Sequence, residues 1–194
     1  MASRVPFPAT SQLASARAAY EAEHPRDGCY FTDLVRAHRH VGLARELAWP
    51  AGVGPGVQRA WVLVSLCPYK DMEVSVLADA LASPAAVALH AVLRGLIDEL
   101  GARSFNVGVL NLGAADGTGS RAAGVPWEPV WVRVVSRGKL TVQASDFGGL
   151  EVFAGASIGH TDPFTVAQAL DAAAAKLGLE WVIGAPSVDL VVEN

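Results

Sequence analysis

Apolar residues recur along the chain with two periods, which predict strands and helices. Five short apolar or alternating segments, bounded by proline, glycine or polar residues, predict strands over residues 59–67, 72–77, 104–113, 127–137 and 150–154. In the fourth of these, Val130, Val132 and Val134 alternate with Trp131 and Arg133. Because successive strand side chains point to opposite faces, the two faces of this strand must meet different environments. Residues 179–192 are predicted to form one or two short edge segments.

Apolar residues at helical spacing predict two longer helices. The first covers residues 83–100, with Ser83 as its N-cap and Gly101 just beyond its end. The second covers residues 162–177, and Asp162 caps it. Both patterns indicate helices that bury one face against a sheet.

The order of these elements defines the organisation of the chain. A tail with a short helix over residues 11–22 occupies residues 1–25, and residues 26–194 form a single domain without an internal repeat or a long linker. The succession strand, strand, helix, strand, strand, helix predicts an antiparallel α+β domain. Residues 1–20 contain arginines and no acidic residue, as organelle presequences do, so import stays open beside the expected cytoplasmic location.

Composition restricts the function further. The chain has 194 residues, of which 52% are hydrophobic and 18% charged, and its formal net charge is −4. An acidic balance argues against binding to nucleic acid, which requires clustered Lys and Arg. The longest apolar stretches are too short, or too interrupted by His90 and Arg94, to span a membrane. The two cysteines, Cys29 and Cys67, cannot form a disulfide framework and suit a reducing compartment.

Several segments, in this order and spacing, carry a family resemblance. They are Cys29-Tyr-Phe-Thr-Asp-Leu, the strand pair within 60–77, Ser104-Phe105-Asn106, the strand 130–137, and Glu151-Val-Phe-Ala-Gly with Asp162-Pro163. Together they resemble the histidine-triad superfamily, in particular its galactose-1-phosphate uridylyltransferase-like branch with the related sugar-nucleotide phosphorylases. The resemblance implies an antiparallel sheet of about five strands with two main helices packed on it. It also implies that two such units work side by side, as a homodimer or with a protein partner.

The chain departs from this family at the positions that carry its chemistry. A histidine on the fourth strand attacks the α-phosphorus of a nucleotide in the resembled family, but Pro129 and Trp131 stand at the two histidine positions. Arg133 replaces a glutamine, glutamate or third histidine. Thr32 replaces the second cysteine of the opening pair and leaves Cys29 alone, which argues against a zinc site. We therefore expect no catalytic residue of the family type, no metal and no cofactor.

Ligand-binding candidates remain on the same strands and loops. They are Asn106, Gly117, Gly119, Ser120, Arg133, Arg137 and His160. The glycine-rich loop could cradle phosphate oxygens with its backbone N–H groups, and the arginines could add charge. The alternatives are a loop that only joins two strands, an asparagine that satisfies the local backbone, and exposed strand arginines. The loop lacks the Gly-Lys-Ser/Thr ending of a Walker motif.

Other reactive side chains have structural interpretations. His38 and His40 are expected on a solvated surface, since residues two apart share a face only on a strand. His90 is expected to be partly buried beside the apolar face of its helix, and Cys67 to be a buried small hydrophobe. His160 is expected in a loop.

Two hypotheses about function follow. Trp127 and Trp131 are expected on one face of a strand, where they would fill space that the family gives to substrate. This favours a catalytically degenerate protein with a binding or interaction role, which retains nucleotide or sugar-phosphate binding or binds a protein partner. The alternative is an active nucleotidyltransferase, phosphorylase or hydrolase that acts on a nucleotide or nucleotide sugar through a rearranged site, with His160 as a candidate residue.

Overall fold

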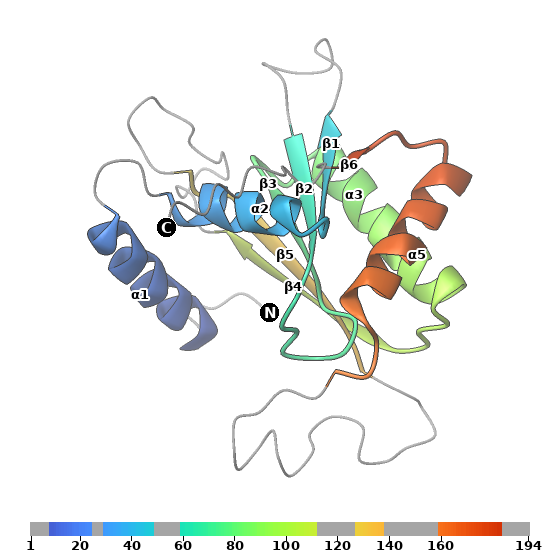
Figure 1. Ribbon diagram of the computed structural model, residues 1–194, viewed down its shortest axis with the longest axis horizontal. Coiled ribbons are helices and arrows are strands. Elements are labelled where there is room, and N and C mark those ends of the chain that lie inside the picture. Colours follow the sequence, from blue (N-terminus) through green and yellow to red (C-terminus); the bar gives the residue numbers. More distant parts are fainter. Residues whose placement is uncertain (1–7, 25–28, 49–58, 112–126, 138–158, 184–194) are drawn as a thin grey trace, which may run out of the picture.

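The computed structural model describes residues 8–24, 29–48, 59–111, 127–137 and 159–183 (Figure 1). These residues form an α+β fold, as the sequence predicts. Its helical elements are α1 (Pro8–Glu23), α2 (Tyr30–His40), α3 (Ser83–Arg94), the π-helical turn η1 (Gly95–Glu99) and α5 (Pro163–Lys176). Its strands are β1 (Ala44–Ala48), β2 (Arg59–Val64), β3 (Val74–Ala78), β4 (Phe105–Asn111), β5 (Val130–Ser136) and β6 (Val182–Ile183). The predicted strand at residues 150–154 lies outside the described residues.

The strands form one sheet in the order β4-β5-β3-β2-β1-β6, and all neighbours are antiparallel. Among the described residues the sheet has six strands rather than the expected five or so, because the pattern did not predict β1. Within the sheet, Trp131 of β5 lies opposite Leu77 of β3 on one side and Leu110 of β4 on the other. Side chains of directly opposed residues share a face, so this row faces one side of the sheet.

Each face of the sheet has its own apolar core. One core lies under α3 and α5 and includes Val62, Val76 and Val132. The other lies under α2 and includes Trp61 and Leu77, so that α2 crosses the face opposite to α3 and α5 (Figure 1). The alternating burial of β5 confirms that its two faces meet different environments. The helix α2 was not predicted, and it covers the face on which Trp131 lies.

The helix α3 packs closely on α5 where it continues into η1. A Cβ atom on Gly95 would lie 2.6 Å from Cδ2 of Leu170 and 3.2 Å from its Cα, so the close approach requires glycine. The prediction for the start of α3 was wrong by one residue: Ala82 is the N-cap, and the Ser83 side chain makes no capping bond. Gly101 adopts a φ of 69° after η1, as expected of a residue that ends a helix.

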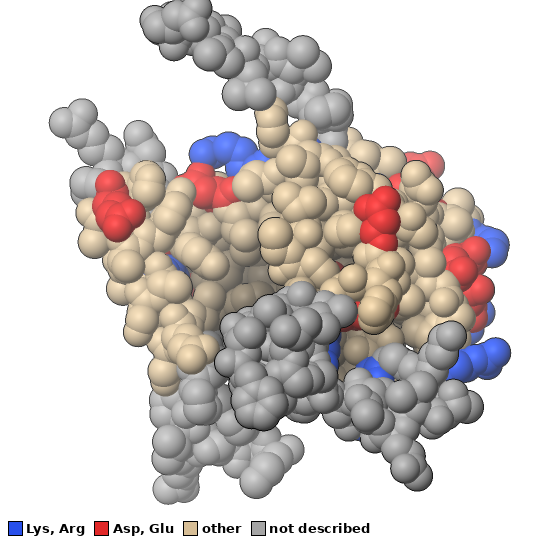
Figure 2. All heavy atoms as spheres, turned by 60° about the horizontal axis from the view of Figure 1, so that its bottom comes forward, with Lys and Arg blue, Asp and Glu red and all other residues tan. Residues whose placement is uncertain are grey.

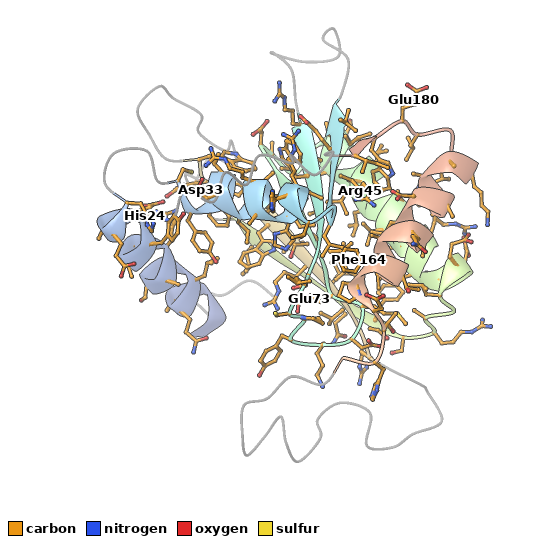
Figure 3. The ribbon with its side chains drawn as sticks, in the orientation of Figure 1. His24, Asp33, Arg45, Glu73, Phe164 and Glu180 are labelled. Carbon is orange, nitrogen blue, oxygen red and sulfur yellow. The ribbon has the colours of Figure 1, made fainter. Side chains whose placement is uncertain are left out.

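The helix α5 is capped as predicted and is tied to strand β1 of the sheet that it covers. The Asp162 side chain accepts a hydrogen bond from the backbone N–H of Phe164. Nε and Nη2 of Arg45 on β1 donate to the two carboxylate oxygens of Asp171 on α5, at 2.6 and 2.8 Å. Arg45 is buried and points toward α5 (Figure 3). This bidentate ion pair joins residues 126 positions apart in sequence.

The predicted N-terminal helix is present as α1, and it contacts the remainder of the molecule. Leu13 packs against the core under α2. Nη1 of Arg17 lies 2.5 Å from a carboxylate oxygen of Glu128, just before β5. The hydroxyl of Tyr20 donates to Asp33 of α2 at 3.2 Å. The side chains of α1 therefore contribute to the surface on the α2 side of the sheet.

Candidate functional site

At the strand position that the resemblance assigns to a nucleophilic histidine, this chain has a tryptophan that packs against its neighbours. Trp131 is half-buried and belongs to the core under α2. Its indole N–H donates to Oγ of Ser75 at 2.8 Å. Its ring meets that of Phe31 edge to face, with centroids 6.2 Å apart. Pro129 is buried immediately before β5, where the absence of a backbone N–H is tolerated.

Arg133 forms an ion pair with a buried carboxylate. It is two residues beyond Trp131 on the same face, and its guanidinium carbon lies 5.5 Å from the centroid of the Trp131 ring. Its Nε and Nη2 both donate to one oxygen of Glu73. Only 6% of the Glu73 side chain is exposed. The other Glu73 oxygen accepts from the backbone N–H of Tyr69 at 2.6 Å. Figure 3 shows Glu73 near one end of the sheet.

The predicted ligand-binding residues that the structure describes do not line one common pocket. Asn106 on β4 is exposed and lies opposite Val135. Arg137 is exposed at the end of β5. Gly117, Gly119 and Ser120 lie outside the described residues. The loop hypothesis therefore stays a prediction.

His160 lies in a loop, as predicted, on a shallow pocket before α5. This pocket has a volume of about 540 Å³ and includes Cys67, Thr161 and Asp162 in its lining. The Asp71 carboxylate accepts from the backbone N–H groups of His160 and Thr161 at 3.0 and 2.9 Å. The prediction that Cys67 is buried was wrong: β2 ends at Val64, so Cys67 belongs to the loop after the strand rather than to its buried part.

His38, His40 and His90 lie on helices, and His24 lies just beyond the end of α1. His90 is exposed on α3 and not partly buried as expected, because the buried side of α3 passes through Ala88 and Val92. His38 and His40 lie on α2, where a separation of two residues points them in different directions. Nδ1 of His38 lies 2.8 Å from the carbonyl oxygen of Leu34. His40 is exposed at the edge of a larger pocket.

This larger pocket lies beside α2 and was not anticipated; it is called the α2 pocket below. Its volume is about 890 Å³. Its lining comes from α1, α2, the α2–β1 turn, β2 and the segment before β5: Tyr20, Thr32, Asp33, Val35, Arg36, Ala37, Arg39, His40, Val41, Arg59, Trp61 and Trp127. The cationic and aromatic members are spread over more than 100 positions of sequence. The one local signal is the spacing of Arg36 and Arg39, which puts them on neighbouring positions of a helix surface.

Charged and aromatic side chains contact one another around this pocket. The guanidinium carbon of Arg39 lies 5.4 Å from the centroid of the Trp61 ring. Nη1 of Arg36 donates to Oδ1 of Asp33 at 2.5 Å, and Figure 3 shows Asp33 on the part of α2 nearest to α1. Partial burial raises the pKa of Tyr20, and its hydrogen bond to Asp33 and the charge of that carboxylate raise the pKa further.

Neither a metal cluster nor a membrane helix occurs in the described part of the chain. No three of its His, Cys, Asp and Glu side chains come together as metal ligands. Cys29 is the N-cap residue of α2, and Thr32 is exposed in the first turn. None of the described helices has the length and hydropathy of a membrane span. On the described part of the face in Figure 2, acidic and basic side chains are interspersed without an extended patch of one sign.

Known structures share this fold. A uridylyltransferase mutant aligns with a TM-score of 0.57 and 14% identity, over 89% of this chain and 55% of its own. A second uridylyltransferase structure aligns with a TM-score of 0.58 and 15% identity, over 89% of this chain and 52% of its own. The chain thus spans about half the length of these neighbours. At this identity the likeness establishes the fold alone. No protein-family model matches the sequence, and no curated protein is detectably similar to it.

Proposed function

We propose that this chain is a histidine-triad-like module that has lost the uridylyltransferase type of catalysis and binds a nucleotide or sugar phosphate without turning it over. One observation carries this proposal. The β5 position that would present a nucleophile holds Trp131, whose ring packs on Phe31 and whose N–H is bonded to Ser75. An indole carries no lone pair that can attack phosphorus.

The neighbouring charge supports the same interpretation. Arg133 could have held a phosphate, but both of its bonded nitrogens donate to Glu73. Because Glu73 is buried, an unpaired carboxylate there would be strongly unfavourable. The pair therefore resists being opened by a ligand, and this part of the face serves structure rather than chemistry.

The test is to look for covalent and non-covalent products separately. The purified chain is incubated with UDP-glucose, UDP-galactose and glucose 1-phosphate. Intact-mass spectrometry then searches for a nucleotidylated protein, and phosphorus NMR searches for turnover. We expect a thermal-stability increase with at least one of these compounds but neither an adduct nor turnover. An adduct on His160, or turnover that His160→Ala abolishes, would instead establish the alternative of an active enzyme with a rearranged site.

We further propose that a second copy of the chain or a protein partner completes the assembly. The chain covers about half of each uridylyltransferase neighbour. Within the described sheet β4 is an edge strand, and its Val107 and Val109 are 41% and 50% exposed. Exposed strand edges of this kind favour pairing. Light scattering coupled to size exclusion should give a dimer that Val109→Lys weakens; a monomer at all concentrations would leave only a different partner protein.

A further inference from the structure

The α2 pocket concentrates positive charge on an acidic protein. Its lining includes three guanidinium groups, those of Arg36, Arg39 and Arg59, against the single carboxylate of Asp33. The whole chain has a formal net charge of −4. A concave site with a local excess of positive charge attracts anions. Arginine side chains bind phosphate groups with two parallel N–H donors.

Arg39 is the best placed of the three. Its guanidinium lies over the Trp61 ring, which holds the planar group in one orientation while leaving its N–H edges available. It makes no ion pair with any carboxylate in the part of the chain that the structure describes. An arginine that is oriented by an aromatic ring and lacks a carboxylate is suited to an anionic ligand.

Arg59 and Arg36 form weaker ion pairs with their carboxylate partners than Arg133 does. Arg59 lies 3.4 Å from a Glu46 oxygen, and its side chain is 45% exposed. Arg36 is paired with Asp33, but that carboxylate also accepts from Tyr20. Exposed pairs of this kind contribute little stability. Both arginines can therefore turn toward a ligand at little cost.

Aromatic side chains of the same pocket suit the organic part of a ligand. Tyr20, Trp61 and Trp127 reach the pocket from three different elements. A volume of about 890 Å³ lies in the range of small-molecule and cofactor sites. A ligand that combines a phosphate group with an organic ring matches this mixture of arginine and aromatic side chains.

We propose that the α2 pocket binds a phosphate ester, with Arg39 and Arg59 as its principal phosphate ligands and Arg36 as a third. This rests on the proposed function, which gives the class of ligand, and it assigns that ligand to a place away from the filled β5 position. The phosphate is the chemistry shared by nucleotides and sugar phosphates, and the two sources are separated by the choice of probe.

The experiment is isothermal titration calorimetry of the full chain with UDP, glucose 1-phosphate, uridine and inorganic pyrophosphate. Arg39→Gln and Arg59→Gln are compared with Arg94→Gln, which removes the same charge from an exposed arginine on α3, across the sheet. We expect each of the first two variants to weaken the binding of a phosphate ester about tenfold or more. We expect Arg94→Gln to leave that binding unchanged. Equal unfolding temperatures for the three variants ensure that lost binding is not lost folding.

Each outcome decides the proposal. If UDP binds and uridine does not, the result supports a nucleotide as the ligand. If glucose 1-phosphate binds, the result supports a sugar phosphate. Binding that all three variants retain would place the ligand elsewhere and overturn this inference while the proposed function stands. Pyrophosphate binding as tight as that of the esters would overturn the role of the aromatic side chains. No binding by the unaltered chain would overturn the inference and the ligand part of the proposed function together, whereas an enzyme adduct would overturn only the proposed function.

Discussion

Replacing Trp131 by alanine should destabilise the fold by about 3 kcal/mol. A large aromatic side chain buries about 150–250 Å² when fully enclosed. Trp131 is half-buried, so about 100 Å² at about 25 cal/mol per Å² gives about 2.5 kcal/mol. The lost hydrogen bond to Ser75 and the lost edge-to-face contact with Phe31 would each add about 1 kcal/mol if they were independent. Because the three contributions overlap, we expect about 3 kcal/mol in total.

Urea denaturation followed by circular dichroism measures this change. The corresponding fall in Tm is about 6–12 °C for a chain of this size. Trp131→Phe keeps the ring and loses the bond to Ser75, so it should cost about 1 kcal/mol. Tyr69→Ala removes an aromatic ring that is 53% exposed, and it should change the free energy of unfolding by less than about 0.5 kcal/mol.

A small effect would refute the argument. If Trp131→Ala unfolds within about 1 kcal/mol of the unaltered chain, the indole does not fill the face of β5, and that face is open to a ligand. The proposed loss of catalysis would then depend on the absent histidine alone. Trp131→His tests whether the missing histidine alone accounts for the proposed loss of catalysis. On a packed face, we expect the new imidazole to give no nucleotidylated protein.

Three further substitutions test the packing and the electrostatics. Gly95→Ala places a methyl group against α5 and should cost about 1–3 kcal/mol in urea denaturation, whereas Gly108→Ala, whose Cβ meets nothing within 4 Å, should cost less than about 1 kcal/mol. Asp171→Asn leaves the buried guanidinium of β1 without its carboxylate and should cost about 2–4 kcal/mol, against less than about 0.5 kcal/mol for Asp98→Asn in an exposed pair. Because the folded-state pKa of Tyr20 lies above its ordinary value of 10.0, the neutral phenol stabilises the fold below that pH, and this contribution is lost as the pH rises through the folded-state pKa. Tyr20→Phe should therefore flatten the fall of the unfolding free energy above pH 10, and a fall as steep as that of the unaltered chain would exclude Tyr20 as its source.

The sequence predicted most of the sheet and α5 because their signals are local. The strands β2, β4 and β5 fall within predicted segments, β3 extends one residue beyond its segment, and Asp162 caps α5 through a bond to a residue two positions away. The strand β1 was missed since Arg45 interrupts its apolar pattern. Its carboxylate partner lies 126 residues away, and no local pattern can reveal such a partner.

The helix α2 was missed for a different reason. Phe31, Leu34 and Val35 have helical spacing, and they pack against one core. That signal was available in the sequence. The same segment also resembles the opening cysteine motif of a family, and that motif does not predict a helix. The α2 pocket was consequently invisible, because it exists only when α2 brings its arginines beside β2.

Under the proposed function, the residues at the β5 positions that the resemblance assigns to histidines argue for a reorganised face rather than a merely damaged one. A tryptophan substituted at random for a histidine would lack a partner for its N–H, but Trp131 has Ser75 on the adjacent strand. An arginine substituted at random would need a carboxylate, and Arg133 has Glu73, which is buried and also holds the backbone of Tyr69. Polar groups satisfied on several elements at once require several compatible residues. The face therefore carries a coordinated set of residues, and a function that needs this surface intact accounts for the set better than loss of a reaction alone.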